Sequence, residues 1–185
     1  MNNLRQNLSQ KRALIAKDAG TQLRLQNNLQ AWLARQNYNT IAIYWPIRDE
    51  FNLLESMKVW ANNQADRRLL LPHTQNNQAL MFQHWNHHEN PQHLGLYQIP
   101  EVGPEHGFET PQAVLVPTLG WLKRDGKTYR LGYGGGFYDR TMASYRSNPE
   151  LMAIPFIGIS YQALEIHETW QPAGHDEALD ELLTD

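Results

Sequence analysis

Glycines and arginines are concentrated between residues 130 and 140, where the sequence is RLGYGGGFYDR. Glycine costs conformational entropy, so four glycines in the five positions from Gly132 to Gly136 need a reason. A glycine-rich turn that opens a helix aims free N–H groups and the positive end of the helix dipole at an anion. Arg130 and Arg140 flank the turn and can add charge-assisted hydrogen bonds to phosphate oxygens. The segment therefore predicts a phosphate-binding loop.

Asp139 lies where the helix after these glycines should begin. A carboxylate beside a polyphosphate would be repelled, but Mg²⁺ removes the conflict, because it takes oxygen ligands from one or two carboxylates and from substrate phosphates. We therefore predict a Mg-nucleotide site with Asp139 on or near the metal. The alternative is a flexible turn and a helix capped by Asp139, although a cap alone does not need four glycines. Neither the Walker A pattern nor the dinucleotide fingerprint fits the run.

Other residues could act at such a site, and each has a plainer explanation. Glu50 could accept hydrogen bonds from an amine-rich ring, or it could be a solvated loop carboxylate near a helix N-terminus. Asp176 could be a second Mg²⁺ ligand, or a helix or turn cap. Taken alone, both are better explained in the plainer way. Tyr133, Phe137 and Tyr138 could stack on a flat heterocycle, or they could anchor the loop to the core.

Composition limits the possible classes of protein. The chain of 185 residues predicts one domain, residues 1–185, with a sizeable core. Its net charge of −3 argues against a general nucleic-acid or acidic-membrane binder. The absence of cysteine excludes disulfides, thiolate metal sites and cysteine nucleophiles. We see neither a secretory signal nor an apolar run of membrane-spanning length, so we expect a cytoplasmic monomer with no nucleic-acid or membrane partner.

Hydrophobic spacing predicts which elements position these residues. Two amphipathic helices with a break at Gly20 are followed by a strand at Thr40–Trp45, a helix at Phe51–Ala61 and a strand at Leu69–Pro72. This β-α-β order implies a parallel pair of strands with a right-handed crossover. Further strands are expected at residues 79–85, 114–116 and 156–160, and a short element of either type at 179–183.

The alternation of strands and helices predicts an open, mostly parallel, Rossmann-like α/β sheet with helices on both faces. Ligands of such sheets bind outside the carboxyl ends of the strands. The segments that follow those ends are residues 46–50, 72–76, 117–130 and 161–176, so we expect these four segments to share one cleft.

Two runs, VLVPTLGW at residues 114–121 and RLGYGGGFYDR at 130–140, resemble the 5-formyltetrahydrofolate cyclo-ligases, also called methenyltetrahydrofolate synthetases. The resemblance covers nearly the whole chain. Leu4-Arg5 followed by Lys11-Arg12 looks like the N-terminal helix of that family, and Tyr44–Glu50 looks like its substrate segment. Ile99-Pro100-Glu101 looks like its mid-chain stretch, and His175-Asp176 with Asp180 looks like its C-terminal motif.

The resemblance implies a Rossmann-like ligase that depends on ATP and Mg²⁺ and acts on a reduced folate. In the family, the formyl oxygen of 5-formyltetrahydrofolate attacks the γ-phosphate of ATP, and ring closure gives 5,10-methenyltetrahydrofolate, ADP and phosphate. By family match, ATP is bound by Arg5, Arg130, Leu131, Gly132, Tyr133, Gly134, Gly135, Gly136, Phe137 and Tyr138. The substrate is bound by Glu50, Tyr133, Gly134, Gly135, Gly136 and Phe137. Asp139 and Asp176 hold Mg²⁺, and Arg130, Tyr138 and Asp139 are catalytic.

The chain departs from the family pattern at three places. Met1 occupies the position of an N-terminal lysine, Leu122–Tyr129 makes a longer and more basic turn, and Val102 replaces the proline after Glu101. The first two departures support an alternative, a non-catalytic nucleotide- or folate-binding module with the same fold. A sugar-phosphate or CoA-ester enzyme on a related scaffold is a third hypothesis, because a fold alone does not define a function.

Overall fold

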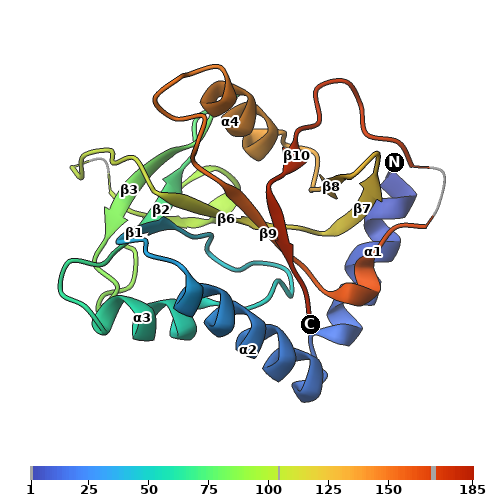
Figure 1. Ribbon diagram of the computed structural model, residues 1–185, viewed down its shortest axis with the longest axis horizontal. Coiled ribbons are helices and arrows are strands. Elements are labelled where there is room, and N and C mark those ends of the chain that lie inside the picture. The colour runs from blue at the N-terminus through green and yellow to red at the C-terminus, as the bar shows by residue number, and fades with distance from the viewer. Residues whose placement is uncertain (1, 104, 168–169) are drawn as a thin grey trace.

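The computed structural model describes residues 2–103, 105–167 and 170–185. Its centre is a six-stranded sheet in the order β11-β9-β6-β1-β2-β3 (Figure 1). Every neighbouring pair in this sheet is parallel except β2 and β3, which are antiparallel. The strands are β1 (Thr40–Ala42), β2 (Arg68–His73), β3 (Met81–Trp85), β6 (Ala113–Pro117), β9 (Phe156–Ile159) and β11 (Glu181–Leu183). The mostly parallel sheet expected from the sequence is confirmed.

Helices cover both faces of the sheet, as expected. The helices α2 (Ala19–Arg35) and α3 (Leu54–Asn62) lie on one face, and α4 (Phe137–Arg146) lies on the other (Figure 1). The first helix, α1 (Asn2–Ile15), lies beside β7 (Gly120–Arg124), where Leu8 packs against Gly120. No helix in the described part of the chain is both long enough and apolar enough to cross a bilayer.

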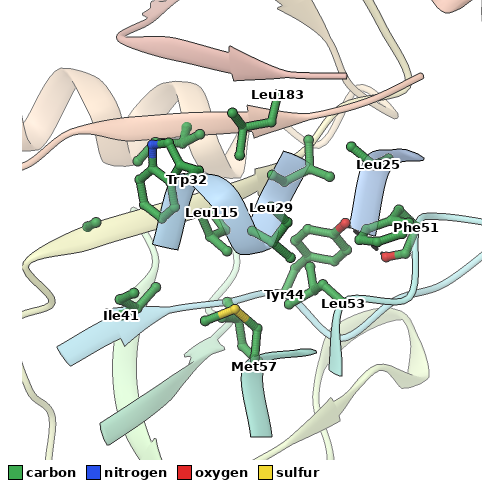
Figure 2. Close-up of a cluster of buried hydrophobic side chains, with 14 of the residues drawn as sticks. Leu25, Leu29, Trp32, Ile41, Tyr44, Phe51, Leu53, Met57, Leu115 and Leu183 are labelled. Carbon is green, nitrogen blue, oxygen red and sulfur yellow. Dashed lines mark hydrogen bonds between the residues drawn. The ribbon is translucent and has the colours of Figure 1, made fainter. Parts of the chain in front are cut away.

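Successive strand residues point to opposite faces, which gives the protein two cores. Ile41 and Leu115 pack under α2 and α3 with Trp32 and Met57 (Figure 2), and Leu69 belongs to the same cluster. Their chain neighbours face α4, and this second cluster includes Ala42, Leu70, Val114, Val116, Met142 and Phe156. Because both faces are covered, the central strands are almost continuously apolar. Each fully buried side chain of this size contributes about 1.5–3 kcal/mol.

Two smaller sheets complete the described fold. In the first, β8 (Lys127–Leu131) lies between β7 and β10 (Ala178–Leu179). The second is the hairpin of β4 (His93–Leu94) and β5 (Pro100–Glu101), with a 3₁₀ turn at Leu96–Gln98 between its strands. A further 3₁₀ turn spans Gln162–Leu164. The element expected at residues 179–183 is therefore strand, because it contributes to β10 and to β11.

Two local expectations were wrong. The first two helices are separated at residues 16–18, not at Gly20, because the Asp18 carboxylate accepts a hydrogen bond of 2.9 Å from the N–H of Thr21 and caps α2. The segment Leu122–Tyr129, expected to be a long turn, forms most of the β7–β8 hairpin. Asp125 and Gly126 form its two-residue tip, with φ values of 51° and 73°. Such a pair of positive φ angles is what a tight hairpin turn requires.

Candidate active site

The glycine loop, residues 132–136, joins the end of β8 to the start of α4. Gly134 and Gly135 are exposed to solvent. Gly136 is the residue that precedes α4, and its φ of 66° and ψ of 11° lie in the left-handed region. Because glycine has no side chain to cap the helix, the first N–H groups of α4 stay open to an outside acceptor. This geometry supports the anion-binding role predicted from the sequence.

Arg5 lies against this loop, although it is 127 residues away in sequence from Gly132. Its Nε–H donates a hydrogen bond of 2.9 Å to the carbonyl oxygen of Gly132. Its guanidinium carbon is 3.5 Å from the point that a Cβ on Gly134 would occupy. The position of α1 therefore brings one cation of the N-terminal helix to the open side of the glycine loop. Met1 lies outside the described residues.

Arg130 and Asp139 form an ion pair at the base of the glycine loop. The Nη2 atom of Arg130 is 2.9 Å from Oδ2 of Asp139, and their side chains are only 6% and 15% exposed. The Arg130 guanidinium also lies 5.2 Å from the centre of the Tyr138 ring. A cation and a carboxylate are thus held side by side where the strand ends and the helix begins.

Asp176 lies at the same end of the small sheet. Ala178 pairs with Tyr129 in antiparallel register, so the residues before Ala178 run alongside the end of β8, toward the glycine loop. The Asp176 carboxylate accepts a hydrogen bond of 2.7 Å from the N–H of Ala173, and it therefore does serve as a turn cap.

No cluster of three or more His, Asp or Glu side chains in the described parts of the chain is arranged to hold a metal ion. A site formed by protein ligands alone is therefore not seen among these residues. Magnesium bound to a nucleotide needs only one or two carboxylates, because phosphates and waters supply the other ligands. The oxygen atoms of Asp139 and Asp176 fit that chemistry.

Glu50 is buried, so its interpretation as a solvated loop carboxylate is wrong. Its side chain is 4% exposed, and its Oε2 accepts a hydrogen bond of 2.9 Å from the N–H of Ile47. Loss of water raises the pKa of Glu50 from 4.5 to about 7. The Ile47 hydrogen bond, the charge of Arg12 and the Tyr133 hydroxyl oppose this rise.

Arg12 matches the family's N-terminal helix in sequence but was not among the predicted site residues, and the structure places it beside Glu50. It is 1% exposed, and its Nη2 donates to the Tyr133 hydroxyl and to the carbonyl oxygen of Arg48. Its Nη1 is 4.0 Å from Oε1 of Glu50. A signal for it was present, because residues seven apart lie on the same face of a helix, and Arg12 follows Arg5 at that spacing.

Three of the four segments expected in one cleft do meet around Glu50. A small cavity of about 10 Å³ is lined by one residue of α1, one of β9 and several residues that follow the strands β1, β6 and β9, namely Arg12, Ile159, Tyr44, Glu50, Phe51, Thr118, Ser160 and Tyr161. The fourth segment, from Pro72 to Asn76, does not line this cavity. Its residues His73 and Thr74 form hydrogen bonds of 2.9 and 2.5 Å with the buried carboxylate of Glu101.

The β4–β5 hairpin, which carries Glu101, also contacts α4. The ring of Tyr97, at the tip of the hairpin, lies with its centre 6.2 Å from the centre of the Phe137 ring.

An open α/β sheet with a glycine loop at a helix N-terminus is typical of proteins that bind anionic ligands near the ends of their strands. The family follows from comparison with known proteins, because a model of the 5-formyltetrahydrofolate cyclo-ligase family matches residues 1–185. The chain belongs to this family of ligases, as its resemblance predicted. A comparison with curated proteins finds no match.

Two solved structures share the fold. A 5,10-methenyltetrahydrofolate synthetase from Mycoplasma pneumoniae is 23% identical, with a TM-score of 0.68 over 98% of this chain and 96% of that one. The synthetase from Aquifex aeolicus, determined by NMR, is also 23% identical with a TM-score of 0.68, over 99% of this chain and 88% of that one.

Proposed function

We propose that this protein converts 5-formyltetrahydrofolate to 5,10-methenyltetrahydrofolate in a reaction that depends on ATP and Mg²⁺. The formyl oxygen attacks the γ-phosphorus of ATP and ADP leaves. The neighbouring folate nitrogen then closes the ring, and phosphate carries the former formyl oxygen away. One observation carries the proposal: the guanidinium of Arg12 donates a hydrogen bond to the hydroxyl of Tyr133 in the glycine loop and also lies 4.0 Å from the carboxylate of Glu50. The predicted nucleotide and folate contacts are therefore adjacent.

The loop side of the site suits phosphoryl transfer. This chemistry needs positioning and charge neutralisation more than it needs a protein nucleophile. Arg5, Arg130 and the open N–H groups of α4 supply positive charge around the glycine loop. Asp139 and Asp176 are the residues that would hold Mg²⁺, which supplies further charge neutralisation at the phosphates.

The Glu50 side of the site suits the folate. A pterin ring presents several N–H donors on one edge, and an ionised carboxylate accepts two of them. The Glu50 carboxyl is buried, and the pKa of the neighbouring Tyr138 hydroxyl is raised by burial and by the negative charge of Glu50. Tyr133 and Phe137 are partly exposed and offer aromatic surface on which the flat pterin could stack.

The direct test is a coupled product assay. Purified protein is mixed with ATP, Mg²⁺ and 5-formyltetrahydrofolate, and the methenyl absorbance and ADP are followed together. We expect both products in equal amounts, and neither without ATP or without Mg²⁺. ADP without the methenyl product would reject the folate assignment. If neither product forms while calorimetry still shows ATP binding, the non-catalytic binding module is the correct function.

Gly136→Ala is expected to weaken ATP binding, because a Cβ at this position would come within 2.7 Å of Nη1 of Arg140 and displace this side chain, whose Nη2 donates a hydrogen bond of 2.8 Å to the carbonyl oxygen of Gly135 in the loop. The left-handed backbone also strains alanine by about 1–2 kcal/mol. Gly126→Ala is the matched control, since Gly126 has a φ of 73° and no atom lies within 4 Å of the point that its Cβ would occupy. Both variants should lose similar stability in urea, and only Gly136→Ala should raise the Kd for ATP. Equal ATP affinity in the two variants would contradict the loop assignment.

A further inference from the structure

Arg12 is unusual because its charged group is buried inside the protein. Charged side chains are almost never fully buried unless they are paired, because removing them from water is costly. Arg12 is 1% exposed, yet its closest carboxylate, that of Glu50, is 4.0 Å away. Its Nε and Nη1 groups have no hydrogen-bond partner in the described structure. The fold therefore keeps a buried cation here that no close ion pair explains.

The hydrogen bonds of Arg12 join two substrate-binding segments. Through Nη2 it holds the hydroxyl of Tyr133, which belongs to the glycine loop, and the backbone of Arg48, which belongs to the turn that carries Glu50. Its guanidinium also lies 5.3 Å from the centre of the Tyr133 ring. One side chain of α1 thus touches both the nucleotide half and the folate half of the site.

The turn held by Arg12 is strained. Arg48 and Asp49 have φ values of 50° and 60°, which few residues other than glycine adopt. Such conformations persist only when the surroundings fix them. The hydrogen bond from Arg12 to the Arg48 carbonyl is one such restraint, and the bond from the Ile47 N–H to Glu50 is another.

The charge of Glu50 depends on the groups that face it from each packed element. These are Arg12 from α1, Tyr44 after β1, Arg48 from its own turn, Tyr133 from the glycine loop and Tyr138 from α4. Only two of the five are cations, and Arg48 is exposed to water. Arg12 is therefore the buried positive charge that faces Glu50.

We propose that Arg12 is a positioning residue of the substrate site, which fixes Tyr133 and the Ile47–Glu50 turn to each other and favours the charged form of the Glu50 carboxyl. Arg12 acts through Tyr133 and Glu50, and it does not itself contact the folate or ATP. This inference rests on the proposed function, because that function makes Glu50 and Tyr133 contacts of the substrate. Its effect on the charge of Glu50 can nevertheless be measured without turnover.

The first experiment measures the titration of Glu50 by NMR, in protein whose glutamate carboxyl carbons are labelled with ¹³C. Glu50→Gln identifies the Glu50 signal. In Arg12→Gln the titration midpoint should rise by about 1 pH unit or more, because an opposite charge within 4–6 Å lowers a carboxyl pKa by that amount. In Arg12→Lys, which keeps the charge, the midpoint should stay close to the wild-type value.

Arg67→Gln is the matched control for this titration. Arg67 is also a partly buried arginine, and it donates to the carbonyl oxygen of Trp60 at 2.9 Å, away from Glu50. Its replacement should leave the Glu50 midpoint unchanged. A folded Arg12→Gln protein with an unchanged midpoint would overturn the charge role. If Arg12→Gln does not fold, Arg12→Lys decides the question, since a raised midpoint in that variant overturns the same role.

The second experiment measures kinetics against pH. Arg12→Gln should raise KM for 5-formyltetrahydrofolate more than KM for ATP. The increase of kcat/KM for folate that accompanies the ionisation of Glu50 should also occur at a higher pH in this variant. Arg12→Lys should restore the pH profile but keep a raised folate KM, because one ammonium group cannot reproduce the planar fork of arginine. An unchanged folate KM in Arg12→Lys would overturn the positioning role. If the wild type makes no methenyl product but its Glu50 midpoint still responds to Arg12, the proposed function fails and the charge role stands.

Discussion

Asp139→Asn is expected to lower kcat for methenyl formation by about 10²-fold or more, the loss seen when one preorganised charged or polar group is removed from a reaction centre. The substitution keeps the shape of the side chain but removes the charge that we assign to Mg²⁺. It should also raise the Mg²⁺ concentration at which the reaction reaches half its maximal rate. Product formation in a titration with Mg²⁺ measures both effects.

The same variant should remain folded. Arg130 loses its charged partner, but the amide oxygen of asparagine can still accept a hydrogen bond from Arg130 Nη2, which is 2.9 Å from Oδ2 of Asp139 in the wild type. Asp125→Asn is the control, because it removes one negative charge at the exposed tip of the β7–β8 hairpin, where asparagine also tolerates the left-handed backbone. Wild-type turnover in folded Asp139→Asn protein would reject the metal assignment.

The periodicity of the sequence was sufficient to predict the central sheet. Runs such as Val114–Val116 and the stretch from Leu69 to Leu71 are too apolar for strands with one wet face, and they are indeed buried on both sides. The ends of elements were harder to place, because they depend on single capping contacts. The hydrogen bond from Thr21 to Asp18 moved the first helix boundary away from Gly20. The Asp125-Gly126 pair is a hairpin signal that was visible in the sequence and was overlooked.

Local sequence identified the glycine loop, since its signal lies within eleven consecutive residues. It could not show that Glu50 is buried, because the burial depends on long-range packing. Arg12 is 38 positions before Glu50, and Tyr133 is 83 positions after it. The residues next to Glu50 in the sequence do not indicate that side chains of α1 and of the glycine loop pack around it. The pairing of Arg130 with Asp139 also came from the structure, because spacing within a loop segment does not determine which of its side chains pair.

Glu50→Gln is expected to make the protein more stable at pH 8 and to weaken folate binding. Burial raises the pKa of Glu50 from 4.5 to about 7. Between these two pH values the folded protein holds a proton that the unfolded chain has released. The free energy of unfolding therefore falls as the pH rises through this range, and this contribution is constant above it. A shift of this size corresponds to a destabilisation of about 3 kcal/mol at pH 8.

Glutamine does not titrate, so the variant should be spared this loss, and its amide oxygen can still accept the hydrogen bond from the Ile47 N–H. Urea unfolding of both proteins should give an advantage for Glu50→Gln that is largest at pH 8 and shrinks toward pH 4.5. If the difference between their free energies of unfolding is the same at every pH from 4.5 to 8, the carboxyl titrates normally and is not desolvated. The variant should lose folate affinity at pH 8 in a binding titration, because an amide cannot accept two N–H donors as a carboxylate does. A site that costs stability in order to bind its ligand is the expected outcome of burying a carboxylate for recognition.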